Sequence, residues 1–226
     1  MAGMAPSDDP GCAASEQLRS DAERNRDRIL EAARRLYAAE GLGVSMAAVA
    51  REAGVGIATL FRRFPAQDDL IAAVFADRMT AYGEAIEAAL ADPGPWHGFT
   101  SYLETVCAMQ AADRGFAEVL TMTFPTAKAL EACRDQAYER FVELIANAKA
   151  TGRLRKDFTP EDMPLLLMAN AGVVAATGDA APDAWRRLVA YLIQAFAAPD
   201  PAPLPPAPSP TAMYRAMITI HRNRNR

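Results

Sequence analysis

Residues 43–70, GVSMAAVAREAGVGIATLFRRFPAQDDL, contain two short helical patterns separated by a glycine, and this segment constrains the fold more than any other. Ser45 is a candidate N-cap for the first helix. Gly54 can take a positive φ at little steric cost, so it can turn the chain sharply into a second helix that runs to Phe64. Pro65 ends this helix because its ring cannot continue the hydrogen-bond ladder. The segment therefore predicts a helix, a tight turn and a second helix.

The second helix has two chemically different faces. Its apolar residues fall at i, i+3, i+4 and i+7, which predicts a buried stripe. The stripe consists of Ile57, Leu60, Phe61 and Phe64. Thr59, Arg62 and Arg63 point the other way. Arginine can bind guanine bidentately and threonine can hydrogen-bond a base or a phosphate, so this outward set is typical of a helix that reads the DNA major groove.

The order of these patterns resembles the TetR family of bacterial transcriptional regulators. An amphipathic helix precedes SMAAVAREAGVGIATLFRRFP, and an acid-started helix, DDLIAAVF, follows it, so the resemblance covers about residues 22–78. TLFRRF after AGV is its most specific part. The resemblance implies DNA contacts from Ser45, Met46, Gly56, Ile57, Ala58, Thr59, Phe61, Arg62 and Arg63. RRFP and the region after it show a weaker similarity to regulators with an SbtR-like carboxy-terminal domain.

Three positions depart from the family pattern. Phe61 stands where tyrosine is common, so it lacks a phosphate-binding hydroxyl and is either a core residue or a DNA contact. Arg63 stands where histidine is usual and adds a permanent charge. Gln67 replaces a common lysine at the start of the next helix. Together, these exchanges move positive charge onto the recognition helix.

Charge is distributed unevenly along the chain. The whole sequence is mildly acidic, with 24 basic and 28 acidic residues. Residues 17–65 contain nine arginines and six acidic residues, a balance of +3, whereas residues 66–198 contain 11 basic and 18 acidic residues, a balance of −7. The first region is therefore the candidate DNA-binding surface. Its early arginines, Arg24, Arg26 and Arg28, either reach phosphates as a basic arm or are simply solvated.

Composition predicts an all-α fold. Alanine is abundant, 51 % of the residues are hydrophobic, and runs of β-branched residues with period two are absent. We expect a disordered arm over 1–20, a three-helix helix-turn-helix DNA-binding domain over 21–67, a larger helical ligand-binding and dimerisation domain over 68–198, and a proline-rich spacer with a disordered tail over 199–226. Further helices are predicted over 68–90, 96–112, 114–121, 125–151, 160–177 and 182–197.

The larger domain is rich in soft and aromatic side chains that suit an apolar small-molecule pocket, although each of them can equally be ordinary core. The candidate ligand-binding residues are Phe99, Tyr102, Met109, Phe116, Met122, Phe124, Tyr138, Met168 and Asn170. Asn170 differs from the rest because an amide in an apolar helix needs a partner, which is backbone, another subunit or ligand. Trp96 belongs to the same aromatic set.

The last two predicted helices of this domain favour a homodimer. Ala169, Gly172 and Ala176 form a smooth strip on which a partner helix can approach closely, and the helix over 182–197 adds a second apolar face. Its apolar residues are Trp185, Leu188, Leu192 and Phe196. Two helices from each subunit give a four-helix interface of the kind typical of TetR-like regulators, and a two-fold dimer implies a palindromic operator.

Other function classes have little support. The chain has two histidines, no phosphate-binding loop and no dinucleotide-binding glycine pattern, so neither an enzyme nor a cofactor is expected. Its start lacks the features of a secretion signal, no apolar run approaches the length of a membrane span, and its three cysteines suit a reducing cytoplasm. We expect Cys107 and Cys133 to be buried small hydrophobes.

The sequence thus predicts a cytoplasmic, dimeric transcriptional repressor that binds a double-stranded DNA operator and releases it when a small, largely apolar molecule binds. Two alternatives stay open. One is a regulator controlled by a protein partner or by no ligand, and the other is an architectural DNA-binding protein.

Overall fold

The computed structural model describes the backbone of residues 10–197 and 202–224 and the side chains of residues 23–197 and 202–220. All regular structure in these ranges is helical, which confirms the all-α prediction. The helices are α1 (Pro10–Glu40), α2 (Met46–Glu52), α3 (Ile57–Arg63), α4 (Gln67–Leu90), α5 (Pro95–Ala112), α6 (Arg114–Thr121), α7 (Lys128–Ala150), α8 (Asp162–Thr177), the short 3₁₀ turn η1 (Gly178–Ala180), α9 (Ala184–Phe196) and α10 (Pro210–Arg224). From α4 to α9, both ends of each helix lie within three residues of their predicted positions.

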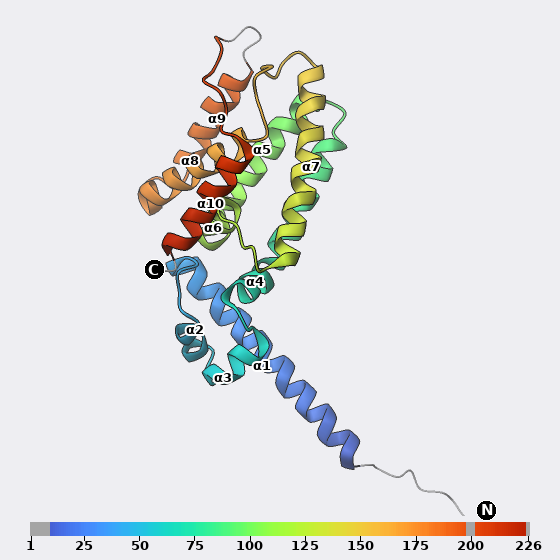
Figure 1. The fold of residues 1–226 in the computed structure, drawn as a ribbon, viewed down its shortest axis with the longest axis vertical. Coiled ribbons are helices and arrows are strands. Elements are labelled where there is room, and N and C mark those ends of the chain that lie inside the picture. The colour runs from blue at the N-terminus through green and yellow to red at the C-terminus, as the bar shows by residue number, and fades with distance from the viewer. Residues whose placement is uncertain (1–9, 198–201, 225–226) are drawn as a thin grey trace, which may run out of the picture.

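The molecule is elongated, with α1, α2 and α3 at one end and a bundle of α5 to α9 at the other (Figure 1). α4 joins the two ends, since it packs against α1 as well as against α5 and α7. Ile86 of α4 is buried in the bundle, and the Tyr82 ring lies 6.1 Å from the Tyr102 ring of α5. α4 is therefore in contact with both ends of the molecule.

The three-helix end has its own core. The side chains from α1, α2 and α3 that are completely buried there are Ile29, Ala32, Ala33, Tyr37, Val49 and Leu60. Burial of this kind contributes about 25 cal/mol per Å² of apolar surface removed from water. The α1 residues recur with helical spacing, as the sequence predicts, so α1 covers α2 and α3 with one continuous apolar face.

The turn between α2 and α3 depends on Gly54. Its φ is +62°, as predicted, and this conformation is strained for residues with a side chain. A Cβ atom built at this position would lie 2.7 Å from Nη2 of Arg28, and that same guanidinium donates a hydrogen bond to the Gly54 carbonyl at 3.1 Å. At the start of α2, Ser45 Oγ accepts a hydrogen bond from Ala48 N at 3.2 Å, so the predicted N-cap is confirmed.

The two ends of the chain are more helical than the sequence predicts. Residues 10–20, predicted to be disordered, form the first part of α1, and residues 210–224 form α10. In α10, Met213 is buried while Met217 and Ile220 are half-buried, and their i, i+4 and i+7 spacing puts them on one face. The apolar residues of α10 are few and lie beside arginines, so the sequence pattern favours disorder. The rest of the predicted disorder, over 1–9, 199–201 and 225–226, lies outside the described residues.

One segment, residues 162–180, is long and apolar enough to cross a membrane when judged by length and composition alone. No apolar run of this length is expected from the sequence. Only 22 % of this segment is buried within the chain. Its inward side chains, among them Leu166 and Leu167, pack into the bundle. Most of its apolar outer face is left uncovered by the described part of the chain.

The two cysteines with described side chains differ from each other. Cys107 is fully buried in α5, and this burial raises the pKa of its thiol to about 12, so it stays protonated at neutral pH. Cys133 of α7 is exposed, so the prediction that it is a buried hydrophobe is wrong. It lies on the outward side of an amphipathic helix, a side that sequence composition alone does not identify.

Candidate nucleic-acid interface and a cavity in the helical bundle

Helix α3 exposes more apolar surface than its sequence pattern predicts. Leu60 and Phe64 point into the three-helix core, but Ile57 and Phe61 are 43 % and 45 % exposed. The predicted four-residue stripe is therefore half wrong, because a seven-residue helix packed on one side buries only the positions nearest α1 and α2. Phe61 is therefore a surface residue, and its ring is available for contact with DNA.

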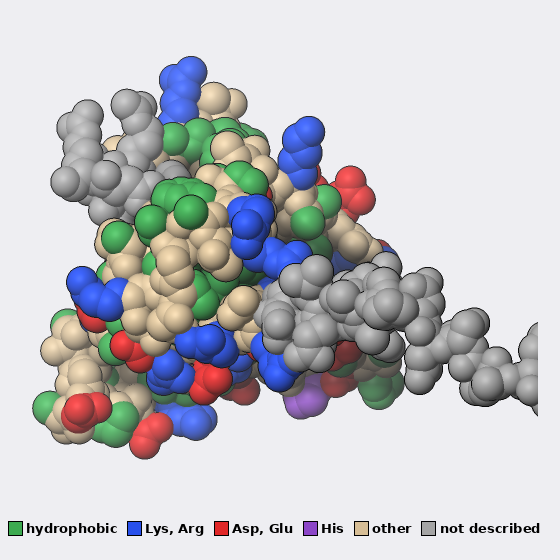
Figure 2. Space-filling model, turned by 90° about the horizontal axis from the view of Figure 1, so that it is seen from below, with side chains coloured by type: hydrophobic (Ala, Val, Ile, Leu, Met, Phe, Trp, Pro, Cys, Tyr) green, Lys and Arg blue, Asp and Glu red, His purple; other side chains and the backbone are tan. Residues whose placement is uncertain are grey.

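The exposed side of α3 combines this apolar surface with positive charge. Gly56, Ala58, Arg62 and Arg63 are also exposed, whereas Thr59 is half-buried. Within the described part of the chain, neither Arg62 nor Arg63 forms an ion pair, whereas Arg35 pairs with Glu31 and Glu52. Figure 2 views this end of the molecule and shows Lys and Arg side chains spread among apolar, uncharged and acidic ones. Such a surface suits the DNA major groove, which offers phosphates, base edges and thymine methyl groups.

The other candidate DNA contacts lie at the start of α2. Ser45 is exposed, although its hydroxyl is engaged in the N-cap. Met46 is buried, so its side chain belongs to the core and only its backbone is available at this position. The α2 terminus thus presents backbone amides and a hydroxyl, the groups that commonly bind phosphate.

Gln67 fastens α4 to the loop before α2. Its side-chain amide donates to the carbonyl of Leu42 at 2.7 Å and to the carbonyl of Val44 at 3.0 Å. In the sequence, Gln67 is notable only because it replaces a lysine that is common in the family. Its actual partners come from a loop more than twenty residues earlier, and no local pattern reports them.

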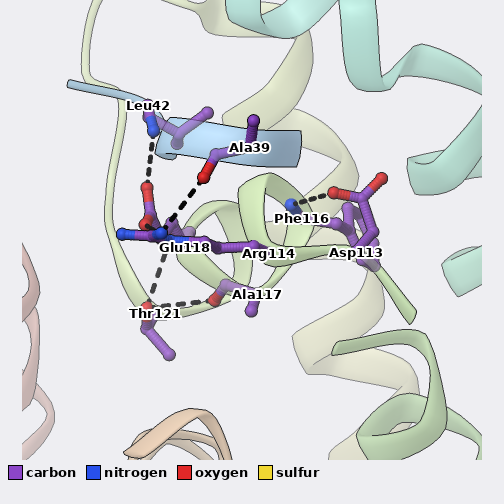
Figure 3. A network of polar contacts seen from close by, with 8 residues as sticks. All are labelled: Ala39, Leu42, Asp113, Arg114, Phe116, Ala117, Glu118 and Thr121. Atoms are coloured by element: carbon purple, nitrogen blue, oxygen red, sulfur yellow. Dashed lines mark hydrogen bonds and ion pairs between the residues drawn. The ribbon is translucent and has the colours of Figure 1, made fainter. Parts of the chain in front are cut away.

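A second connection joins the three-helix end to the bundle through α6 (Figure 3). Glu118 Oε2 accepts a hydrogen bond from the backbone amide of Leu42 at 2.7 Å, and Arg114 donates to the carbonyl of Ala39 at 3.2 Å. Arg114 and Glu118 also form an ion pair at 3.7 Å. These charge-assisted contacts hold α6 against the carboxyl end of α1.

Close packing reinforces this junction. A Cβ atom at Gly115 would lie 2.7 Å from the Phe75 ring and 3.2 Å from Cβ of Tyr37, so only glycine lets α6 approach α1 and α4 this closely. The Phe75 ring lies 6.2 Å from the Tyr37 ring and 6.1 Å from the Phe116 ring. The junction is thus both hydrogen-bonded and tightly packed, which favours rigid transmission of a displacement.

The bundle contains a partly open cavity of about 230 Å³. Its walls come from α4, α7, the start of α8, the segment after α6, and α10. Arg134 of α7 is one lining residue, and it donates to the carbonyl of Val119 at 2.6 Å and to the carbonyl of Met122. Burial lowers the pKa of Arg134, while the nearby carboxylate of Glu131 opposes this. One cavity wall is therefore bonded directly to the end of α6.

Comparison with known proteins gives two family models that cover separate parts of the chain. Residues 29–74 match the model of bacterial regulatory proteins of the tetR family, and residues 94–194 match the C-terminal domain of SbtR-like transcriptional regulators. The first covers the three-helix end and the start of α4, and the second covers most of the bundle. The chain belongs to the TetR family.

Similar proteins include a transcriptional regulator that matches part of this chain and solved structures that share its fold. An HTH-type transcriptional regulator of Staphylococcus aureus strain USA300 is 44 % identical over 54 residues, which are 24 % of this chain and 29 % of that protein. A TetR family regulator from Shewanella sp. PV-4 has a TM-score of 0.53 and 24 % identity, over 75 % of this chain and 95 % of its own. FadR from Bacillus subtilis, in complex with stearoyl-CoA, has a TM-score of 0.51 and 13 % identity, over 77 % and 98 %.

The nine candidate ligand-binding residues of this TetR family protein do not gather at the cavity. Tyr138 is the one among them that lines it. Phe99, Tyr102, Phe116, Met122 and Phe124 are buried in the bundle core, Asn170 is buried at an internal polar cluster, and Met109 and Met168 are half-buried. The Phe99 ring, for example, stacks 6.3 Å from Phe141 and meets the edge of Phe158 at 5.3 Å. An aromatic residue in an apolar helix gives the same sequence signal whether it lies in the bundle core or on the cavity wall.

Asn170 joins α8 to α5 inside the bundle. Its amide nitrogen donates to Gln110 Oε1 at 2.9 Å and to the carbonyl of Cys107 at 3.2 Å, and Gln110 in turn donates to the carbonyl of Ala117 in α6 at 3.5 Å. These groups meet the predicted need for a partner at the amide nitrogen, whereas the buried Oδ1 of Asn170 has no hydrogen-bond partner among the described residues. Asn170 also lies outside the cavity wall.

We expect Asn170→Ala to lower the free energy of unfolding by about 2 kcal/mol, because two buried acceptors lose their donor. Urea unfolding followed by circular dichroism measures this. Asn147→Ala, at an exposed site on α7, is the matched control and should change stability by less than about 0.5 kcal/mol. Equal stabilities for the two variants would contradict the structural role of the Asn170 amide.

Proposed function

We propose that this transcriptional regulator is a dimeric, ligand-responsive repressor that releases a palindromic operator when a small molecule enters the bundle cavity. The observation that supports it most is the direct bonding of one cavity wall to α6, and of α6 to the DNA-binding end. Arg134 donates to the carbonyl of Val119 in α6 and to that of Met122 just after it, while Arg114 at the start of α6 and Glu118, next to Val119, bind α1 and the loop after it. The exposed side of α3, with Arg62 and Arg63, supplies the operator contacts.

The outer face of α8 and α9 supports the dimer. Ala169, Gly172 and Ala176 are all exposed on α8, with Leu165 at 44 % and Tyr191 of α9 at 53 %. The two helices pack against each other, and each of them carries exposed apolar residues. Apolar surface of this extent on a bundle suits a two-fold helical interface. Trp185 of α9 is buried within the subunit and stays out of this interface.

Ligand entry acts through the α6 connection. An occupant that moves Arg134 displaces the carboxyl end of α6, and α6 is short enough to pass this movement to Glu118 and Leu42. The recognition helices of the dimer then no longer match successive major grooves. A coupling free energy of about 1 to 3 kcal/mol corresponds to a loss of operator affinity of roughly 5- to 150-fold. The same fold holds stearoyl-CoA in FadR from Bacillus subtilis, so it can enclose a ligand.

Operator selection from random DNA with the purified protein tests the DNA-binding part of the proposal. We expect a palindromic sequence with half-sites about one DNA turn, or a multiple of it, apart. Affinity for the selected operator, measured by fluorescence anisotropy, should fall linearly on a plot of log K against log salt, with a modest slope because we expect few cationic contacts with phosphate per subunit. Absence of sequence enrichment, or a flat salt plot, would contradict specific DNA binding.

A second arm tests ligand response. Compounds that raise the melting temperature of the free protein are added to the protein–operator complex, and release of labelled DNA is measured. Release by at least one stabilising compound supports the repressor mechanism. If every compound that binds leaves operator affinity unchanged, the protein is instead a regulator controlled by a partner or by no ligand.

A further inference from the structure

Helix α10 forms one wall of the bundle cavity. Pro210, Met213, Tyr214 and Met217 all line it. Met213 is only 7 % exposed, so this helix contacts the bundle through its Met213 side. These residues lie beyond position 194, where the match to the SbtR-like domain ends. The cavity is thus completed by a part of the chain that the family model does not describe.

The start of the proline-rich segment is anchored to the bundle, which fixes where α10 can reach. Arg155 donates to the carbonyl of Ala202 at 3.0 Å, and the backbone amide of Leu204 donates to Asp157 Oδ2 at 3.2 Å. Arg155 and Asp157 also pair with each other. Because segment 202–209 is rich in proline and stiff, this anchor helps to place α10 over the cavity.

The charged residues of the cavity wall are mainly acidic. Three carboxylates, those of Glu131, Asp135 and Glu161, line it together with the single cation Arg134. The carboxylate of Glu131 pairs with Arg134 at 3.6 Å and accepts a hydrogen bond from the amide of Phe124 at 2.7 Å. The negative charge of Glu131 is therefore neutralised by the positive charge of Arg134. Asp135 and Glu161 remain as excess negative charge on the wall.

Aromatic and thioether groups surround this charge. Four aromatic rings line the cavity, and they belong to Tyr82, Tyr138, Phe141 and Tyr214. The face of an aromatic ring attracts cations through its quadrupole, and this attraction strengthens when water is excluded. Met163, Met213 and Met217 add polarizable sulfur to the wall. Carboxylates among aromatic faces favour an organic cation over a neutral or anionic occupant.

An unpartnered hydroxyl also points to an occupant with polar character. Thr123 lines the cavity and is 3 % exposed, and its Oγ1 has no hydrogen-bond partner in the described chain. Buried hydroxyls in folded proteins nearly always have a partner. The oxygen dipole of Thr123 can stabilise a positive charge in the cavity without any proton transfer.

We propose that the cavity binds a compact lipophilic organic cation, with Asp135 and Glu161 supplying the countercharge and Tyr214 of α10 supplying one aromatic face. The cavity volume of about 230 Å³ lies below the range of about 300 to 1,000 Å³ typical of drug-sized ligands, which favours a small ligand. The inference rests on the proposed function only in treating this cavity as the effector site.

Calorimetric titration of the full chain without DNA tests the ligand class. The probes are benzyltrimethylammonium, its anionic counterpart phenylmethanesulfonate, and benzyl alcohol as a neutral aromatic. At low ionic strength, where screening is weak, we expect the cation to bind about tenfold tighter than either of the others. Equal affinity for the cation and the anion, or no binding of the cation, would overturn the proposal.

Two pairs of variants locate the site. Glu161→Gln should weaken cation binding about fivefold, whereas Glu139→Gln, at an exposed position on α7 outside the cavity wall, should leave it unchanged. Tyr214→Leu should weaken it about fivefold, whereas Tyr214→Phe keeps the aromatic face and should retain affinity. Circular dichroism melting verifies that each variant is folded, and Asp135→Asn replaces Glu161→Gln if the latter unfolds. Binding that is unchanged in all of these variants would overturn the assignment.

Operator release is measured separately, so the two proposals fail in different ways. In one outcome, the cation binds with the expected affinity changes in the variants and yet leaves operator affinity unchanged. That result supports the ligand class and contradicts the effector role of the cavity. Operator release by another compound, with no binding of the cation, supports the repressor mechanism and contradicts the ligand class.

Discussion

Replacing both Arg62 and Arg63 with alanine is expected to weaken operator binding by about 100-fold or more, since each well-placed arginine contact contributes about 1 to 3 kcal/mol and the dimer contains two copies of α3. Both side chains are exposed, and neither has an ion-pair partner among the described residues. The folded structure therefore loses little when they are removed. Fluorescence anisotropy with the selected operator measures the loss.

A matched control removes two cations from the other end of the molecule. Arg153 and Lys156 are exposed in the loop after α7, and their double alanine variant should bind the operator with nearly wild-type affinity. Equal losses for the two double variants would indicate a nonspecific charge effect rather than recognition by α3.

Single substitutions refine the expectation for α3. We expect Arg63→Ala to reduce operator affinity more than Gln67→Ala does, because Gln67 is occupied with the carbonyls of Leu42 and Val44. Gln67→Ala should instead lower the melting temperature of the three-helix end. The reverse order of affinities would mean that α3 docks on DNA differently from its relatives.

Gly172→Arg is expected to convert the proposed dimer into a monomer and to weaken operator binding by about 100-fold or more. In the proposed two-fold interface the new arginines are placed on the contact surface, and burying unpaired charge costs several kcal/mol. A Cβ atom at Gly172 meets no atom within 4 Å in the subunit, so the fold of each subunit should persist. Sedimentation velocity reports the oligomeric state, and anisotropy reports the operator affinity.

The control for this variant is Glu139→Arg, which adds arginine at an exposed position on α7. It should remain dimeric. A Gly172→Arg protein that stays dimeric and still binds the operator would contradict an interface built on α8 and α9.

Strong local signals explain why the helix boundaries were predictable. Gly54 and the Ser45 cap act within a few residues of the chain, and α6 begins and ends where the sequence predicts, at Arg114 and Thr121. Tail helix α10 was missed because its apolar spacing is short and its neighbours are proline and arginine. Its stability comes from packing on the bundle, which is a tertiary effect.

The candidate site was predictable only where local sequence signals decide it, and not where tertiary packing does. Exposure of Arg62 and Arg63 follows from helical periodicity, whereas the exposure of Ile57 and Phe61 depends on how much of α3 the neighbouring helices cover. The cavity wall draws on residues that are distant in sequence, such as Tyr82 and Tyr214. Composition identifies aromatic residues, but only the packing of α5 against α7 separates core rings from cavity rings.

The contacts between the DNA-binding end and the bundle have an evolutionary consequence. Glu118, Arg114 and Gln67 bond to the backbone amide of Leu42 and to the carbonyls of Ala39, Leu42 and Val44. Bonds to main-chain atoms do not depend on which side chains the three-helix end carries. Substitutions that retarget α3 to a new operator can therefore accumulate without disturbing the joint. One bundle can be combined with many different recognition helices, and the sequence of α3 can diverge faster than the joint that holds it.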